Sequence, residues 1–254
     1  MLYPHTNLKD FLDEWVYKIN VPAYIETDPV QFPLKYSHLL DKEVAAFLTA
    51  TITWGNRKMI LNSATRMFAA MGVSPYDFIM SEGYKKLGAG NIHRTFFEQD
   101  LYYMCRGLRS CYLNQASLEN VFGGKPNLWT GIECFRSNLA QANDGIFSKH
   151  VSNPTANSAC KRLHLALRWL VRNDGIVDLG IWSTISPSEL YIPLDVHVGR
   201  VSRKLGMLNR NQNDKKAVES LTEVLREFCP EDPVKYDYAL FGIGESAHDL
   251  TIIK

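Results

Sequence analysis

The sequence has few features that would place this chain outside the ordinary globular proteins. Its 254 residues include five cysteines, and no two of them form a Cys-x-x-Cys pair. Their odd number and irregular spacing argue against a disulfide framework and a structural zinc site. No apolar run approaches the roughly 18 residues of a membrane-spanning helix. The first residues lack the basic and apolar regions of a secretory signal. We therefore expect a cytoplasmic protein that makes no contact with a membrane.

The chain also lacks alternating apolar patterns, internal repeats and low-complexity linkers. Hydrophobic residues make up 46% of the sequence and charged residues 22%, which is usual for a folded globular protein. Apolar residues recur at helical spacing in almost every segment, so the sequence predicts an all-α fold. Helices are expected over 8–19, 41–54, 57–71, 93–114, 128–141, 160–172, 195–205, 214–228 and 232–241, with a short helix from Pro75 and a connecting arm over 22–36.

Several of these segments begin with a residue that favours a helix N-terminus. We expect Asp41, Asn56, Asp195 and Asp214 to cap the helices that follow them, and Thr155, Asn157 or Ser158 to cap the helix over 160–172. The loop over 148–154 is the one convincing boundary between two lobes. It divides the chain into a helical lobe over 1–150 and a second lobe over 151–254, whose last helix packs back on the first lobe.

Charge is distributed unevenly along the chain. The formal net charge is only +1, but residues 161–216 hold ten basic and five acidic residues, a net charge of +5. A basic segment in an otherwise acidic chain permits a nucleic-acid face, although a solvated surface explains the charge equally well.

The stretch Pro193-Leu194-Asp195-Val196-His197 is the most informative part of the sequence. An aspartate that opens a helix accepts hydrogen bonds from free N–H groups, and the positive helix end favours its ionised form. The preceding proline fixes the entry of the chain. A fixed carboxylate beside basic residues suits a site that handles phosphodiesters.

"IPLDVHVGRV" resembles the catalytic-aspartate segment of the helix-hairpin-helix DNA glycosylases, the superfamily of endonuclease III and the 8-oxoguanine glycosylases. Members that also cut the backbone have a lysine upstream, near the start of the preceding helix, and Lys161 stands at a similar place. The stretch from Asp41 resembles the first helical pair of the superfamily, and "YDYALFGIGE" from Tyr236 resembles its closing helix. The whole chain also resembles a bacterial family of unknown function.

Two features depart from the superfamily pattern. The glycine-rich hairpin before the lysine is replaced by residues 153–158, "NPTANS", and 34 residues separate Lys161 from Asp195 because of an extra piece over 173–187. Archaeal 8-oxoguanine glycosylases resemble this variant. The resemblance thus implies a two-lobed glycosylase-like fold whose hairpin is divergent or absent.

The resemblance implies a base-excision DNA glycosylase, with or without lyase activity, that acts on an oxidised purine such as 8-oxoguanine in damaged double-stranded DNA. Lys161 would attack the sugar C1′ and Asp195 would stabilise the charge that develops there. The site needs no cofactor. A four-cysteine iron–sulfur loop is not expected, because only Cys229 lies late in the chain. His248-Asp249 has no partner histidines, so no metal site is expected, and no protein partner is predicted.

Other residues are candidates for binding DNA or the flipped base. In the resembled superfamily the junction at Trp54, Asn56 and Arg57 carries a residue that probes the gap left by a flipped base. Trp54, Trp169, Trp182 and Tyr191 are candidates for an aromatic wall, with core packing as the alternative for each and the favoured one for Trp169. The remaining candidates for contact with substrate or phosphate are Arg162, His197, Arg200, Arg203 and Lys204.

Two other functions stay open at this stage. The first is a nucleic-acid-binding protein that has the fold but no activity, which the missing hairpin favours. The second is an enzyme that acts on nucleosides or another small molecule, which predicts a closed pocket and weak binding to duplex DNA.

Overall fold

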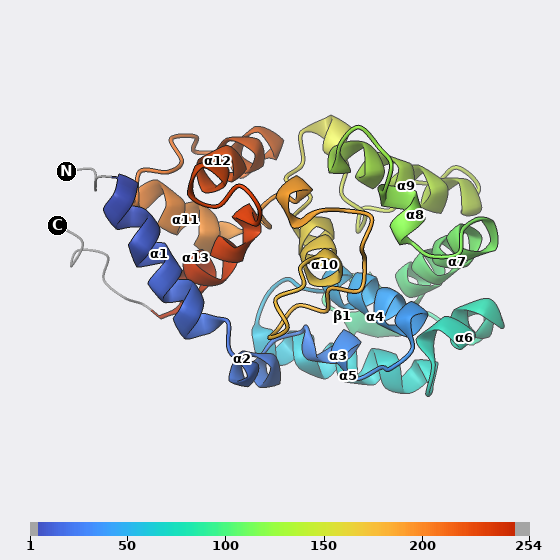
Figure 1. Ribbon diagram of the computed structural model, residues 1–254. Coiled ribbons are helices and arrows are strands. Elements are labelled where there is room, and N and C mark those ends of the chain that lie inside the picture. The colour runs from blue at the N-terminus through green and yellow to red at the C-terminus, as the bar shows by residue number, and fades with distance from the viewer. Residues whose placement is uncertain (1–4, 247–254) are drawn as a thin grey trace.

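The computed structural model describes residues 5–246, and across this range the fold is all-α, as the sequence predicts (Figure 1). The first helices of the chain are α1 (His5–Ile19), α2 (Pro22–Thr27), α3 (Gln31–Leu34), α4 (Leu39–Thr51), α5 (Arg57–Met71) and α6 (Pro75–Met80). They are followed by a short antiparallel hairpin of β1 (Asn91–His93) and β2 (Phe96–Phe97). The next helices are α7 (Glu98–Asn114), α8 (Glu119–Phe122), α9 (Leu128–Ala142) and α10 (Lys161–Val171). The last are α11 (Val196–Lys204), α12 (Lys215–Phe228) and α13 (Tyr236–Glu245).

The helices pack in two groups that lie side by side (Figure 1). The larger group contains α2 to α10 and the hairpin, with α10 packed on α4 and α7 on α9. The smaller group contains α1, α11, α12 and α13, and in it α13 packs against both α1 and α11. The first and last helices of the described chain are therefore neighbours.

Helix α10 is central because most of its side chains are buried, including the polar His164 and Arg168. Leu163, Ala166, Leu167 and Leu170 are buried, and Trp169 has no exposed surface. Trp169 packs in the core, as the favoured alternative in the sequence has it, and also borders the cavity described below. Helix α12 is amphipathic instead, and its buried residues recur every three or four positions: Ala217, Val218, Leu221, Leu225 and Phe228.

The grouping of helices differs from the expected division of the chain at residue 150. Helix α10 lies beyond that boundary but packs on α4, and α1 lies before it but packs on α13. A boundary in the loop over 148–154 therefore separates α10 from the helix that it packs against. The last helix packs mainly on α1 and α11.

Most helix starts agree with the sequence. The side chains of Asn56, Asp195 and Asp214 each accept a backbone hydrogen bond at the N-terminus of α5, α11 and α12. Asp41 does not cap α4, which begins after His38. Its carboxylate instead accepts hydrogen bonds from Ser74 Oγ and Tyr76 N, 2.7 and 2.9 Å away, and so ties α4 to the start of α6.

Two other segments differ from their expected structure. The helix expected from His93 begins only at Glu98, because residues 91–97 form the hairpin. Helix α10 begins after Cys160, which has a left-handed backbone (φ 47°). Ser158 Oγ accepts a hydrogen bond from Cys160 N but does not cap the helix. The connecting arm over 22–36 contains the short helices α2 and α3.

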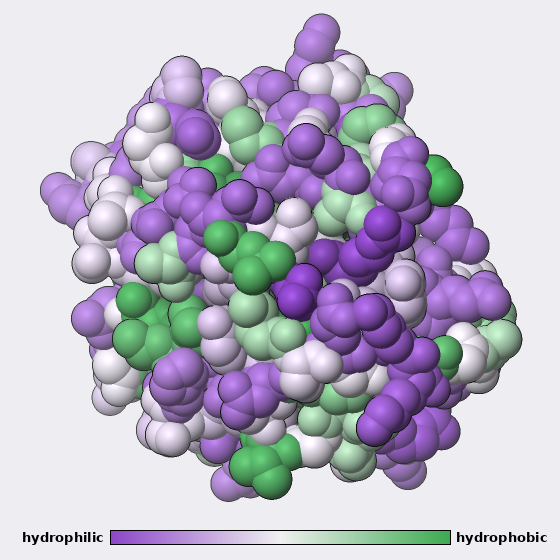
Figure 2. Space-filling view, turned by 90° about the vertical axis from the view of Figure 1, so that its right-hand side faces the viewer, coloured by the Kyte–Doolittle hydropathy of each residue, from purple (hydrophilic) through white to green (hydrophobic). Residues whose placement is uncertain are grey.

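The extra piece over 173–187 runs across the larger group and fills its core with Val177, Trp182 and Ile185. Its backbone N–H groups at Ser183 and Thr184 donate to Glu119 in α8, each over 2.6 Å. Hydrophilic side chains predominate on the face shown in Figure 2, and hydrophobic ones stand there in small separate groups.

Candidate functional site

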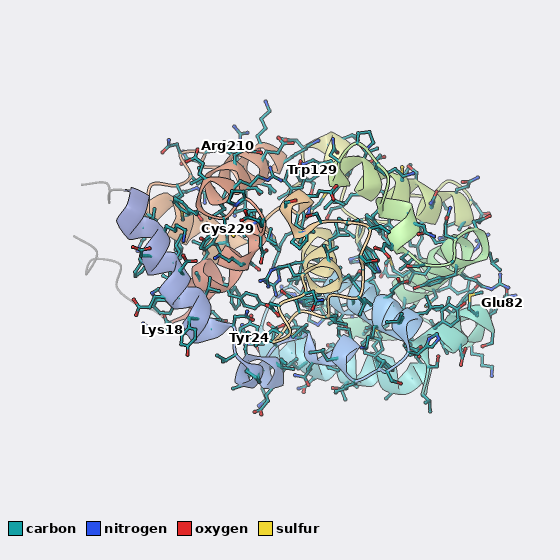
Figure 3. The ribbon with its side chains drawn as sticks, viewed as in Figure 1. Lys18, Tyr24, Glu82, Trp129, Arg210 and Cys229 are labelled. Atoms are coloured by element: carbon teal, nitrogen blue, oxygen red, sulfur yellow. The ribbon has the colours of Figure 1, made fainter. Side chains whose placement is uncertain are left out.

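A cavity of about 600 Å³ lies between the two groups of helices. Its walls come from the arm after α2, the α4–α5 junction, the N-terminal ends of α10 and α11, and α13. Tyr24, which lies where the N-terminal helices meet the central loops (Figure 3), contributes to the wall opposite the junction. Seven of the candidate site residues from the sequence line this cavity: Trp54, Arg57, Lys161, Arg162, Trp169, Asp195 and His197.

Lys161 and Asp195 form an ion pair in the cavity. Lys161 Nζ lies 3.5 Å from Asp195 Oδ2, and the side chains are 33% and 11% exposed. The other carboxylate oxygen, Oδ1, accepts a hydrogen bond of 2.8 Å from Val198 N at the start of α11. One carboxylate thus caps a helix and faces an amine, because its two oxygens point to different partners.

The Asp195 segment is held from a second direction by Asn213. The side-chain amide of Asn213 donates to the carbonyl of Asp195 over 3.0 Å, and its oxygen accepts from Arg203 Nη2 at 2.5 Å. Arg203 Nε also donates to the carbonyl of Arg210 at 2.7 Å. The loop before α12 therefore fixes the start of α11, and Arg203 is part of that arrangement.

Asp237 in α13 is a second carboxylate at the cavity, and the sequence analysis did not single it out. It pairs with Arg168 of α10. Burial raises the pKa of Asp237 to about 6; Arg168 and Lys161 oppose this rise, and the nearby Asp195 carboxylate adds to it. Asp237 is the second residue of "YDYALFGIGE", and the resemblance of this stretch to a closing helix was a signal for it.

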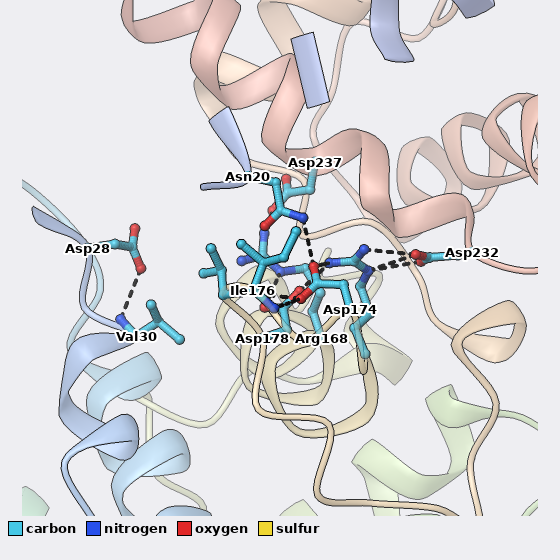
Figure 4. A network of polar contacts seen from close by, with 11 residues as sticks. Asn20, Asp28, Val30, Arg168, Asp174, Ile176, Asp178, Asp232 and Asp237 are labelled. Carbon is cyan, nitrogen blue, oxygen red and sulfur yellow. Dashed lines mark hydrogen bonds and ion pairs between the residues drawn. The ribbon is translucent and has the colours of Figure 1, made fainter. Parts of the chain in front are cut away.

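A buried ionic network, which includes the cavity residues Arg168 and Asp237, joins the two groups of helices (Figure 4). Arg172 Nη2 lies 2.8 Å from Asp232, just before α13, and its Nη1 lies 2.9 Å from Asp174. Asp178 accepts from Arg172 and lies 3.4 Å from Arg168 Nε. Buried charges are tolerated only when they are paired in this way. The network therefore helps to set how α10 and α13 sit on either side of the cavity.

The wall of the cavity formed by Trp54 and Arg162 is aromatic and cationic. The guanidinium of Arg162 lies 4.9 Å from the ring of Trp54, and Nη1 donates to Thr51 O over 2.5 Å. Burial lowers the pKa of the Arg162 guanidinium. The Trp54 ring also packs against His93 and His150, with ring centroids 4.8 and 5.7 Å apart. Trp54 is thus held rigidly where it lines the cavity.

Arg57 and His197 complete the cavity near α13. Arg57 Nη2 pairs with Glu245 over 2.7 Å and its guanidinium lies 5.1 Å from the ring of Phe241. The ring of His197 meets the same phenylalanine edge-on at 6.1 Å. The buried Nδ1 of His197 has no hydrogen-bond partner within residues 5–246.

Trp182, a candidate for the aromatic wall, does not line the cavity. It is buried among Phe47 and Phe122, and its Nε1 donates to the buried Glu43 carboxylate over 2.7 Å. Tyr191 also lies elsewhere, against Trp129 and with its ring centroid 5.6 Å from that of His164. Trp182 thus lies in the core and Tyr191 is partly buried against it, so packing, the alternative given for each ring, accounts for their positions.

Asn56, Arg200 and Lys204 lie outside the cavity on exposed surface. Asn56 caps α5. Arg200 Nη2 donates to the carbonyl of Gly244 over 2.8 Å. With Arg203, Arg200 and Lys204 form what we call the α11 face.

The segment that replaces the glycine-rich hairpin is a compact turn. Asn153 caps a short 3-10 helix, and Asn157 and Cys160 adopt left-handed backbones with φ of 61° and 47°. Asn157 Nδ2 donates to Asp214 over 2.9 Å, and Lys215 N donates to Asn157 O over 3.1 Å. The turn before α10 therefore packs on the N-terminus of α12 without the glycines that usually take such conformations.

Within the described part of the chain, no group of three or more His, Cys, Asp or Glu side chains is arranged to hold a metal ion. His248 and Asp249 lie outside the described residues. Nor does any described helix have the length and apolar content to cross a membrane.

An all-α fold with an amine and a carboxylate paired in a cavity defines a helical protein with a candidate site for nucleophilic chemistry. The chain belongs to DUF2400, a family of proteins of unknown function whose model matches residues 28–246. No curated protein and no solved structure matches the chain.

Proposed function

We propose that this protein is a base-excision DNA glycosylase in which Lys161 is the nucleophile. The observation that carries the proposal is the pair of Lys161 Nζ and Asp195 Oδ2, 3.5 Å apart in a cavity of about 600 Å³. The volume lies within the usual range of ligand pockets, roughly 300–1,000 Å³. It accommodates a nucleotide turned out of a duplex.

The residues of the site have distinct roles in this reaction. Lys161, once neutral, attacks C1′ of the flipped nucleotide, so that an N–C1′ bond forms while the bond to the base breaks. The base leaves with the bonding electrons and takes up a proton. Asp195 accepts the proton of the lysine and passes it to the departing base, so that its carboxylate is ionised again and stabilises the positive charge at the sugar. Transfer of a second amine proton to the ring oxygen opens the sugar ring and gives the protonated Schiff base, from which strand cleavage by β-elimination is possible.

Cationic and aromatic groups at the rim support DNA as the substrate. Trp54 and Arg57 line the cavity, and Arg200 and Lys204 lie on exposed surface at the α11 face. Basic side chains bind phosphates and an aromatic ring stacks on an extruded base. An oxidised purine such as 8-oxoguanine remains our proposed substrate, on the basis of the resemblance to archaeal 8-oxoguanine glycosylases.

Borohydride trapping on a panel of damaged duplexes tests the proposal. We expect the wild-type protein to form a covalent crosslink with at least one of these duplexes, and Lys161→Ala to form none. Lys125→Ala, which changes an exposed lysine away from the cavity, is the matched control. Equal crosslinking by Lys161→Ala would show that another amine carries out the step.

The cavity volume also favours a second candidate, an enzyme that acts on free nucleosides. This candidate predicts turnover of nucleosides and no binding of duplex DNA even at low salt. Measuring both with the same preparation separates the two functions.

A further inference from the structure

A second hollow lies beside the cavity, on the outer side of the α4–α5 junction. It has a volume of about 330 Å³ and is lined by Asn56, Lys58, Met59, Asn62, Ser63 and Arg66. Successive residues of the junction border the two spaces in turn: Gly55 and Arg57 line the cavity, whereas Asn56 and Lys58 line the hollow. The two are thus neighbours on one surface, and the lining of the hollow includes basic and polar groups but no carboxylate.

The β1–β2 hairpin stands next to this hollow and is firmly anchored there. His93 contacts Ser63 Oγ through Nδ1 at 3.0 Å and Trp54 O through Nε2 at 2.8 Å. Arg66 Nη2 donates to the carbonyl of Ile92 over 3.2 Å. On the other side of the hairpin, His150 Nε2 lies 3.0 Å from Thr95 O. The tip of the hairpin is therefore held in place by contacts with α5, the junction and the loop after α9.

Arg94 at this tip has an exposed side chain that lies against Gly55. A Cβ atom at position 55 would come within 2.5 Å of Arg94 Nη1. Arg94 itself adopts a left-handed backbone (φ 50°), which is uncommon outside glycine, asparagine and aspartate. The guanidinium of Arg94 thus lies over Gly55, whose own backbone is left-handed (φ 95°).

Three exposed cations on this surface have no carboxylate partner within residues 5–246: Lys58, Arg66 and Arg94. Most other arginines of the described chain are paired, such as Arg106 with Asp144 and Arg210 with Asp214. The nearby acids Glu98 and Asp100 accept hydrogen bonds from the backbone N–H groups of Gly88 and Phe97. We call this set of cations the hairpin face.

We propose that the hairpin face is a second phosphate-binding surface, which holds the backbone of a DNA duplex on the side of the cavity away from the α11 face. This inference rests on the proposed function, because it takes duplex DNA as the ligand. Exposed cations without carboxylate partners, around a hollow without carboxylates, suit phosphodiesters, because each phosphate contact releases condensed counterions and the protein loses no internal ion pair. The cavity then lies between two cationic surfaces.

The salt dependence of duplex binding tests this surface. The probe is a duplex with a stable abasic-site analogue, and the variant is Lys58→Ala with Arg94→Ala. Neither side chain donates a hydrogen bond within the described structure, so the fold should persist. We expect the slope of log affinity against log salt to flatten by about two units, since each lost phosphate contact is worth about 0.9.

Lys86→Ala with Lys125→Ala is the matched control, because it removes the same charge from exposed positions outside both hollows. It should change the slope by less than about half a unit, the effect expected when no phosphate contact is lost. Equal flattening by both pairs, or an unchanged slope for Lys58→Ala with Arg94→Ala, would overturn the proposal. If the alanine pair unfolds, Lys58→Gln with Arg94→Gln provides the same test with longer side chains.

Base release is measured on the same proteins at saturating concentration and low salt. A protein that binds the probe with a steep slope but releases no base contradicts the proposed glycosylase and leaves the hairpin face intact. A protein that releases base normally and shows no change of slope in the variant contradicts the hairpin face alone.

Discussion

Lys161 and Asp195 meet across the boundary between the two groups of helices. Lys161 begins α10, which packs on α4, whereas Asp195 caps α11, which packs on α13. Their separation of 3.5 Å therefore depends on how the groups are joined. Arg168 and Arg172 of α10 form ion pairs with Asp237 and Asp232, and these pairs join the two groups. The proposed chemistry thus depends on contacts outside the reacting pair.

Asp195→Asn should lower single-turnover base release by at least about 100-fold, as loss of an electrostatic group of this kind does. Stability should change little, because asparagine still accepts the hydrogen bond from Val198 N. Asp214→Asn is the control, since Asp214 caps α12 in the same way and does not line the cavity. If Asp195→Asn unfolds more easily and has normal turnover per folded molecule, the carboxylate is only structural.

Asp237→Asn should change how stability depends on pH. Because the pKa of Asp237 is raised to about 6, the folded protein keeps this proton over a range in which the unfolded chain, with a pKa near 3.9, has lost it. The proton stabilises the fold at low pH, and that contribution is lost as pH rises from about 4 to about 6. Relative to the variant, the wild type should lose free energy of unfolding across this window.

Urea unfolding at several pH values measures this difference. Asp174→Asn is an informative control because the pKa of Asp174 is lowered. Its contribution to stability is present above its usual pKa and is lost as pH falls, which is the opposite sign. Parallel pH profiles for the wild type and Asp237→Asn would mean that Asp237 titrates normally.

Trp182→Phe should destabilise the protein without affecting base release per folded molecule. The buried Glu43 carboxylate loses one of its donors, and a lost hydrogen bond to a buried group costs about 1–3 kcal/mol. Trp169→Phe serves as the stability control, because the indole N–H of Trp169 has no partner within residues 5–246. A selective loss of base release in Trp182→Phe would place this ring at the substrate after all.

Arg200→Ala and Lys204→Ala should each flatten the salt slope of duplex binding by about one unit and leave the preferred lesion unchanged. Arg203→Ala should have a further effect, because Arg203 also holds Asn213, which in turn binds the Asp195 carbonyl. We expect it to slow base release at saturating DNA as well. Comparing binding with single-turnover rates for the three variants distinguishes these roles.

Base release should continue in the presence of chelators, since neither proposed catalytic residue acts through a metal. Metal analysis of freshly purified protein and an assay in EDTA check this. Stoichiometric iron or zinc together with lost activity would point to His248 and Asp249, beyond the described residues.

The sequence predicted the helical fold because helical periodicity is a local signal. Asp195 was singled out by its place at a helix start two residues after Pro193, and Lys161 by the resemblance to glycosylases that carry a lysine upstream; the structure brings these two residues together. The hairpin over 91–97 was missed, since its strands are two and three residues long and too short for an alternating pattern. Trp182 was considered for the aromatic wall because the sequence alone does not distinguish a tryptophan of the core from one at a binding site. Its hydrogen-bond partner Glu43 lies 139 positions away in the sequence, so this contact could not be predicted from the local sequence.

The pairing of Asp237 with Arg168 could not be recognised for a similar reason. Each is a charged residue in a helix whose other side chains are mostly apolar, and only tertiary packing brings the two together at the wall of the cavity. The division at residue 150 was drawn from a loop, whereas the helices group by the faces they bury. Such information is distributed over the whole chain and is not visible in any one segment.

The contact between α1 and α13 has a consequence for synthesis. Leu8, Leu12 and Trp15 are buried in the folded protein, and α1 packs chiefly on a helix that ends at Glu245. A chain emerging from the ribosome therefore exposes these three apolar side chains until α13 has been translated. We expect nascent chains that stop before Tyr236 to be held by chaperones or degraded, and the cavity to form only in the last step of folding.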